Sequence, residues 1–252
     1  MTPGRGPVTV RVAETRGSTP REAGATMRVW ADRTEGTIGG GALEWEAIRL
    51  ARERLENGAG PMRRTFPLGP DLGQCCGGVV VLEFTPGDTA AGAHTAPPLW
   101  IWGAGHVGRA IAGVMAPLGD RIITLVDTTP ERLPRALPET VRPLVASDPV
   151  RAVPHAGDTA CHLILTYSHD LDLALCDALL RQGFAFCGLI GSATKWARFR
   201  KRLAAMGHSE AEISRITCPI GDPSLGKHPQ AIAVGVAAAL LRQPGTTGDR
   251  TA

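Results

Sequence analysis

Residues 99–108 read Leu-Trp-Ile-Trp-Gly-Ala-Gly-His-Val-Gly, and this stretch decides the fold of the second half of the chain. An uncharged apolar run meets a Gly-x-Gly-x-x-Gly turn, and residues 109–116 continue as a helix-like segment. A second, mostly aliphatic run, 122–126, leads to Asp127, nineteen positions after Gly108. A strand, a glycine turn, a helix and an acid on the next strand are typical of nucleotide-binding α/β domains.

Each glycine of this turn has its own expected role. Gly103 permits the tight turn, Gly105 lets a ligand approach the backbone, and Gly108 lets the helix pack closely on the strand. The free amides at the helix N-terminus then face an anion, and His106 lies inside the turn, near any ligand bound there. Asp127 favours the hydroxyls of an unphosphorylated ribose, as in NAD-binding turns. The sequence therefore predicts a cofactor site at this turn.

From residue 99 onward, strand and helix patterns alternate, which implies a parallel sheet with right-handed crossovers. We therefore expect a Rossmann-like α/β domain over 99–244, with 245–252 as a disordered tail. The predicted strands are 99–102, 121–126, 141–145, 162–166, 185–189 and 217–220. The predicted helices are 106–117, 171–182, 192–206, a short one capped at 209, and 229–241.

The first 85 residues lack this alternation, so we expect a smaller α+β domain there. One helix, 42–55, has an apolar stripe and ends at an Asn-Gly pair. The predicted strands are 8–13, 26–30, 63–66 and 79–84. Residues 86–98 are rich in Pro, Gly, Ala and Thr and are predicted to be a linker.

Composition excludes several classes of protein. The 252 residues carry a formal net charge of only +3, with scattered Lys and Arg, which argues against nucleic-acid binding. We expect neither a secretion signal nor a membrane span, and hence a cytoplasmic protein. Four cysteines, the single ones in apolar segments, are expected to be buried small hydrophobes: Cys161, Cys176, Cys187 and Cys218.

The other two cysteines lie in Gln74-Cys75-Cys76-Gly77-Gly78, a loop before a strand. Glycine amides can lower the pKa of a thiol, giving a thiolate that attacks sulfur or holds a soft metal. Cys75 and Cys76 are therefore our candidate catalytic and metal-binding residues, with Gln74 beside them. The alternative is that one thiol packs inward and the other is incidental.

Three further segments are candidate ligand sites. Gly39, Gly40 and Gly41 precede a helix and offer amides to an anion, unless they only form a sharp loop. His169 follows a predicted strand and can move a proton or contact a phosphate. Asp170 lies beside it, where we expect it mainly to cap the helix. The last segment starts at Ser192, a predicted helix cap. Lys195 follows one turn later, and we expect it either to reach a phosphate or to be solvated.

Taken together, these motifs resemble the XdhC/CoxI family of xanthine dehydrogenase accessory proteins over nearly the whole chain. The matching segments are 17–21, 36–44, 72–78, 103–108, 168–170, 188–192 and 219–221. The resemblance implies a molybdenum-cofactor (molybdopterin) chaperone that supports cofactor sulfuration and insertion into a xanthine dehydrogenase-type apoenzyme. It also implies a cysteine desulfurase as partner, and such a protein is an accessory factor more than a true catalyst.

Two other interpretations stay open at this point. One is an NAD(P)-dependent oxidoreductase, with a nucleotide on the glycine turn and His169 as the acid or base. The other is an interaction module that binds a desulfurase and an apoenzyme but no small molecule. A homodimer is compatible with each, because residues 29–38 and the final helix offer surfaces that can pair.

Overall fold

The computed structural model describes residues 6–69, 77–88 and 96–243, and the chain forms two compact units, Met1–Ala93 and His94–Ala252. The division falls within the predicted linker, 86–98. Most of that linker, the predicted tail 245–252 and the residues Gln74, Cys75 and Cys76 lie outside the described residues.

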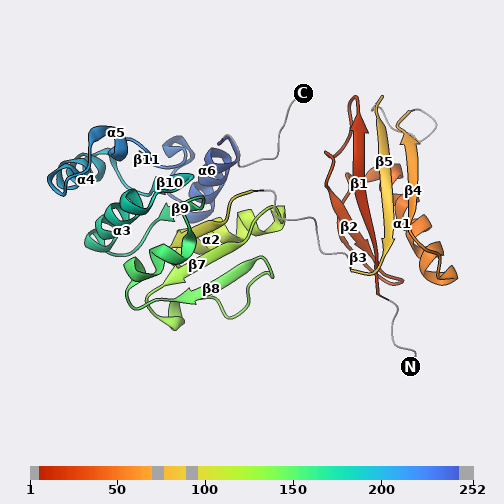
Figure 1. Ribbon diagram of the computed structural model, residues 1–252, viewed down its shortest axis with the longest axis horizontal. Helices are drawn as coiled ribbons and strands as arrows, with labels where there is room; N and C mark the ends of the chain where they lie inside the picture. The colour runs from red at the N-terminus through yellow and green to blue at the C-terminus, as the bar shows by residue number, and fades with distance from the viewer. Residues whose placement is uncertain (1–5, 70–76, 89–95, 244–252) are drawn as a thin grey trace. The chain divides into compact units, whose positions relative to one another are not determined.

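The N-terminal unit is an antiparallel sheet with one helix, in agreement with the α+β prediction (Figure 1). Its strand order is β3-β2-β1-β5-β4. The strands are β1 (Val8–Arg16), β2 (Thr26–Val29), β3 (Thr34–Gly36), β4 (Met62–Pro67) and β5 (Val79–Pro86). The short edge strand β3 was not predicted, because its Thr-Glu-Gly sequence is exposed and has no apolar alternation.

Alternation along β1 and β5 places one face of this sheet against α1 (Gly41–Asn57). That inner face is formed by buried side chains such as Val10, Leu82 and Phe84, which pack with Leu43 of the helix. The other face carries charge: Arg11 donates to Glu83 at 2.8 Å. The helix ends where Gly58 takes the left-handed conformation, as the Asn-Gly pair predicts.

The C-terminal unit is a six-stranded parallel sheet in the order β11-β10-β9-β6-β7-β8, which confirms the Rossmann-like prediction. The strands are β6 (Leu99–Trp102), β7 (Ile123–Asp127), β8 (Val141–Val145), β9 (Cys161–Ile164), β10 (Phe186–Leu189) and β11 (Ile216–Thr217). Strand β11 begins one residue before the predicted 217–220 and ends after two residues. The order reverses between β6 and β9, so a crevice opens between the loops that follow them.

Helices cover both faces of this sheet. They are α2 (His106–Met115), α3 (His169–Gln182), α4 (Ala193–Ala205), α5 (Glu210–Ile213) and α6 (Pro229–Leu241). Helices α2 and α6 pack on one face through residues such as Ile111 and Val236. Helices α3 and α4 pack on the other through Leu179 and Leu203, where Trp100 and Trp102 of β6 are also buried.

Helix caps explain where these helices begin, and one cap differs from the prediction. Ser192 caps α4 by accepting from the Lys195 amide, as expected. Helix α3 begins at His169, two residues earlier than predicted, because Ser168 and not Asp170 is its cap. The Asp170 side chain is exposed and pairs with Arg202 at 3.2 Å.

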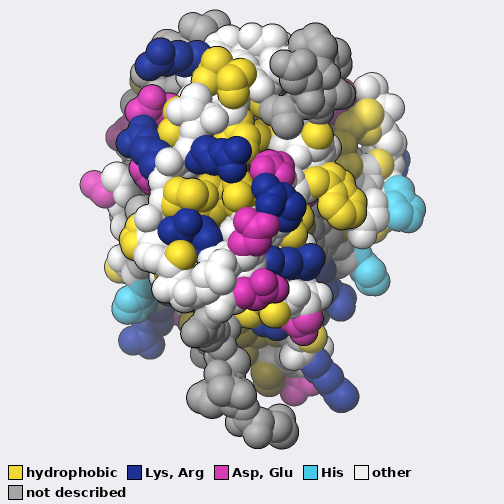
Figure 2. Space-filling view, turned by 90° about the vertical axis from the view of Figure 1, so that its right-hand side faces the viewer, with side chains coloured by type: hydrophobic (Ala, Val, Ile, Leu, Met, Phe, Trp, Pro, Cys, Tyr) yellow, Lys and Arg dark blue, Asp and Glu magenta, His cyan; other side chains and the backbone are white. Residues whose placement is uncertain are grey.

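The charge distribution on the surface is mixed. Figure 2 shows Lys and Arg side chains interspersed with Asp and Glu on one face, without a large patch of one sign. Such a surface gives no electrostatic footprint for nucleic acid on the face shown. No helix of the described chain has the length and apolar character needed to cross a bilayer.

Candidate functional site

The glycine turn after β6 is shaped by the strand beside it. Gly103 has a φ of 122°, and a methyl group there would overlap the carbonyl oxygen of Leu165, which follows β9. A methyl group at Gly108 would overlap the Gly103 carbonyl oxygen. Two of the three predicted glycine roles, the tight turn and the close packing, are therefore visible in the geometry.

Gly105 differs from both, because nothing lies within 4 Å of the position that its side chain would occupy. It is the N-cap of α2, where no side chain supplies a cap and the first turn holds no acidic residue. His106, the first residue of the helix, is exposed. An uncapped helix N-terminus beside open space favours an anion from outside the chain.

Asp127, predicted to bind ribose, is hydrogen-bonded within the protein. Its Oδ2 atom accepts from the Ala104 amide at 2.8 Å, and Oδ1 accepts from the Thr128 amide at 2.7 Å and hydroxyl at 3.3 Å. The side chain is 4% exposed. Asp127 thus ties the end of β7 to the glycine turn of β6.

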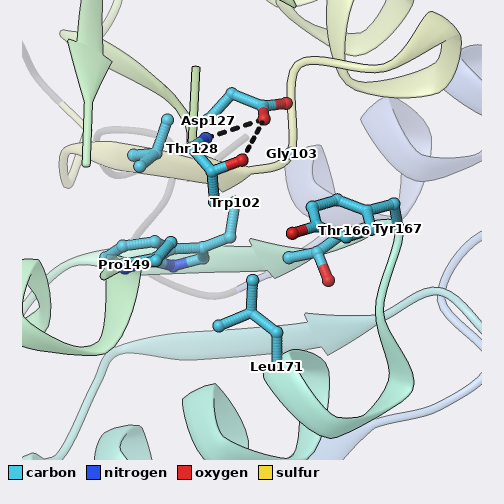
Figure 3. A pocket seen from close by; sticks show the side chains of 9 residues that line it. Trp102, Gly103, Asp127, Thr128, Pro149, Thr166, Tyr167 and Leu171 are labelled. Carbon is cyan, nitrogen blue, oxygen red and sulfur yellow. Dashed lines mark hydrogen bonds between the residues drawn. The ribbon is translucent and has the colours of Figure 1, made fainter. Parts of the chain in front are cut away.

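A small pocket lies between these loops, at the carboxyl ends of β6, β7 and β9 (Figure 3). Trp102, Pro149 and Leu171 give it apolar walls, and Thr166 and Thr128 give it hydroxyl groups. This is the position where open α/β sheets bind their ligands.

Two exposed side chains meet at this pocket. Tyr167, which lines it, is 66% exposed. The guanidinium carbon of Arg132 lies 4.4 Å from the centre of the Tyr167 ring, a cation–π contact. Arg132 also reaches to 3.8 Å from Asp127 Oδ1. Sequence reasoning missed Arg132, because its segment after β7 has no motif.

A buried ionic network supports the loop that carries Tyr167. Asp172 Oδ1 accepts from the amide and the hydroxyl of Thr166 at 3.0 and 2.7 Å. Its Oδ2 accepts from Lys195 Nζ at 2.6 Å, and the two side chains are 1% and 12% exposed. Lys195 Nζ also donates to the Ile190 carbonyl at 3.1 Å. Lys195 is therefore neither solvated nor directed at a phosphate, the two roles considered from the sequence.

The remaining candidates of this unit lie at the same edge of the sheet. His169 is exposed at the start of α3, and Ser192 is exposed at the start of α4. Cys218 is half-buried, and burial raises its pKa to about 11, so its thiol stays protonated near neutral pH. The other three single cysteines are fully buried, as expected, and burial raises the pKa of each: Cys161, Cys176 and Cys187.

The floor of the pocket rests on a buried histidine. Trp102 donates through Nε1 to Nδ1 of His162 at 3.2 Å, and the two rings stack with centroids 6.0 Å apart. His162 is completely buried, and Nε2 has no hydrogen-bond partner among the described residues. Burial lowers the pKa of His162 to about 4, so the ring is neutral near pH 7.

In the N-terminal unit, the amides before α1 already hold an anion, the carboxylate of Glu44. Its Oε2 accepts from the amides of Ile38 and Gly40 at 3.0 and 3.1 Å, and from the hydroxyl of Thr37 at 2.5 Å. Partial burial would raise the pKa of this carboxyl, but the hydrogen bonds outweigh it and hold the pKa below its usual range. The amides of Ile38 and Gly40 are thus engaged by the chain itself.

Three N-terminal motifs meet around one turn. A methyl group at Gly39 would overlap Pro20, and a methyl group at Gly78 would overlap the Ser18 carbonyl oxygen. Gly78 accepts a hydrogen bond from the Leu68 amide at 2.7 Å, so residues on both sides of the cysteine-containing segment are joined. Gln74, Cys75 and Cys76 themselves lie outside the described residues, and their predicted roles stay predictions. Within the described chain, no three side chains of His, Cys, Asp or Glu gather as a metal site.

Comparison with known proteins supplies the family. A family profile described as the XdhC Rossmann domain matches residues 99–240, and one described as the XdhC and CoxI family matches residues 2–66. The chain belongs to the XdhC family. The resemblance predicted from the motifs is thereby confirmed.

Two individual proteins are similar to this XdhC-family chain. A protein of Escherichia coli strain K12, described as the uncharacterized protein YqeB, is 32% identical over 240 residues, which are 92% of this chain and 42% of that protein. This chain thus spans less than half of that relative's length. A crystal structure from Bacillus halodurans, described as a xanthine dehydrogenase, matches with a TM-score of 0.73 at 16% identity, covering 96% of this chain and 94% of that one. At that identity the structure supports the fold alone.

Proposed function

We propose that this chain is an accessory protein for maturation of a xanthine dehydrogenase-type molybdoenzyme. In this role it binds the molybdenum cofactor, supports its sulfuration with a cysteine desulfurase, and delivers it to the apoenzyme. The observation that carries the proposal is membership of the XdhC family across both units. The bound cofactor would supply a pterin phosphate and a molybdenum centre with sulfur ligands.

The chemistry of the residues fits such a group in two places. Cys75 and Cys76 offer soft sulfur, which suits a sulfur-bearing metal centre. The residue after them, Gly77, adjoins Gly78, which packs on the Ser18 carbonyl. This close packing fixes the position of Gly78, two residues after Cys76 in the sequence.

The turn after β6 is better suited to bind the phosphate than the turn before α1. Glu44 already accepts from the amides of Ile38 and Gly40, whereas the N-cap Gly105 has neither a side-chain cap nor an acid in the first turn. We therefore assign the phosphate-binding role to residues 103–108 and a structural role to residues 38–40. A nucleotide such as NAD(P) is the second ligand class that this turn suits.

The experiment that tests the role of the thiols uses the full chain with Cys75→Ser and Cys76→Ser, singly and together. The expected result is at least a tenfold loss of cofactor retention or of apoenzyme activation in the double variant. Cys218→Ser is the matched control, because that thiol belongs to the other unit and its raised pKa keeps it protonated.

Unchanged cofactor retention together with unchanged activation in the double variant would overturn the role of the thiols. Capture of the desulfurase and the apoenzyme by a chain that binds no pterin would favour the interaction-module alternative. A reduced nicotinamide signal that turns over with a substrate, and requires His169, would favour the oxidoreductase.

A further inference from the structure

We propose that the pocket of the C-terminal unit selects a nucleotide whose adenosine ribose carries a 2′-phosphate, and that Arg132 recognises this phosphate. The inference rests on the proposed nucleotide-binding role of the turn at residues 103–108 and adds a substrate class to it. It reverses the expectation from the sequence, in which Asp127 favours an unphosphorylated ribose.

In a ribose-binding role, Asp127 must offer accessible carboxylate oxygens to two hydroxyls. Here Oδ2 accepts from the Ala104 amide. Figure 3 shows that Oδ1 accepts from both the amide and the hydroxyl of Thr128. With only 4% of the side chain exposed, the carboxylate offers little accessible surface to the hydroxyls of a ribose. Asp127 therefore acts as a clamp on the turn.

The cation beside Asp127 is the guanidinium group of Arg132. Arg132 lies in the short 3-10 helix Pro130–Arg132 that follows β7, and 46% of its side chain is exposed. Its Nη1 atom is 3.8 Å from Asp127 Oδ1, beyond hydrogen-bond distance, so the guanidinium keeps donors for a ligand. In Rossmann-type domains an arginine near this acid accommodates a 2′-phosphate, and a guanidinium binds phosphate through two parallel hydrogen bonds.

The adenine base of the proposed nucleotide would contact side chains around the pocket. Trp102, Pro149 and Leu171 give the pocket apolar walls, and Tyr167 adds an exposed aromatic ring at its edge. The exposed ring of Tyr167 offers a planar base an aromatic surface at the edge of the pocket.

The test measures binding of NADPH and NADH to the full chain by calorimetry at one ionic strength. The expected result is that NADPH binds at least tenfold more tightly than NADH, and that 2′,5′-ADP competes better than 5′-AMP. Arg132→Gln should abolish the preference by weakening NADPH about tenfold while leaving NADH unchanged. Arg135→Gln, a change of an exposed arginine in the same segment, is the matched control and should keep the preference.

Equal or tighter binding of NADH, or no binding of either nucleotide, would overturn the proposal. So would an Arg132→Gln variant that loses both nucleotides equally, since that result indicates a structural role for Arg132. Failure here leaves the molybdenum-cofactor role standing, because that role is measured by cofactor retention in the cysteine variants.

Discussion

The two glycine-rich turns of this protein look alike in sequence and differ in what they hold. Before α1, the amides of Ile38 and Gly40 donate to Glu44, which lies six and four residues further along the chain. Before α2, Gly105 has no side-chain cap, and the first turn of the helix contains no acid. We infer that the amides of a glycine-rich turn stay available to an external anion only when the following helix turn brings no carboxylate of its own.

The largest expected effect separates the glycines that shape the second turn from the one that faces open space. Gly108→Ala would push a methyl group into the Gly103 carbonyl and should cost about 3 kcal/mol or more in the free energy of unfolding. Gly105→Ala, where nothing lies within 4 Å, should cost no more than about 1 kcal/mol, the difference between glycine and alanine at an N-cap, but weaken anion binding. Denaturant unfolding of both variants measures the two losses in the free energy of unfolding. Equal losses would contradict the different roles assigned to Gly108 and Gly105.

An effect of similar size is expected in the loop that follows β9. Asp172→Ala would leave Lys195 buried without its counter-ion, at a cost of about 3–5 kcal/mol. Adding Lys195→Met to that variant should recover most of the loss, because the uncompensated charge is gone. Urea unfolding of the two single variants and the double variant measures the coupling, and strictly additive losses would show that the pair is not coupled.

Lowering the pH should destabilise the C-terminal unit before the N-terminal unit. His162 has an ordinary pKa of 6.5 and a folded-state pKa of about 4, so its stabilising effect is complete above pH 6.5 and is lost between pH 6.5 and 4. The full shift corresponds to about 3 kcal/mol. Residues 1–93 contain no histidine, and the lowered pKa of Glu44 withdraws stability only below about pH 4.5.

The measurement is hydrogen exchange of each unit between pH 7 and pH 5, corrected for intrinsic rates. The C-terminal unit should lose protection first, and His162→Phe should remove that loss. Two results would contradict the assignment to His162. One is protection that falls first in the N-terminal unit, and the other is protection in the C-terminal unit that still falls with pH in the His162→Phe variant.

The smallest effect tests whether the turn before α1 can be converted into a site for an external anion. Glu44→Gln removes a charged acceptor from two amides and the Thr37 hydroxyl and should cost about 1–2 kcal/mol. The variant, unlike the parent chain, should then gain stability in phosphate, because the neutral glutamine no longer repels an external anion from these amides. Thermal unfolding with and without phosphate checks this, with Glu53→Gln on the exposed face of α1 as control.

The sequence predicted the second turn well and the first turn only in part. Strand, turn and helix around residues 99–115 follow from local patterns, and β6, β8 and α6 were predicted at their observed ends. Glu44 was visible in the sequence, but its reach back to the turn depends on a side-chain conformation that spacing does not specify. The cap of α3 was misassigned for a similar reason, because Ser168 and Asp170 are both good caps.

The features that the sequence did not predict are made by contacts between distant segments. Arg132 meets Tyr167, which is 35 positions away, only because β7 and β9 end on either side of β6. Lys195 meets Asp172 for a related reason, since α3 and α4 begin at neighbouring strands. Periodicity and spacing describe one element at a time, whereas these pairs depend on the order of strands in the sheet.

The turn before α2, and not the turn before α1, is the one to which we assign an external anion. The most direct measurement is a titration of the full chain with pyrophosphate, followed by amide ¹H–¹⁵N NMR. We predict concentration-dependent shifts for the amides of residues 105–108 and unchanged amides at residues 38–40. Shifts at residues 38–40 with residues 105–108 unmoved would contradict the account.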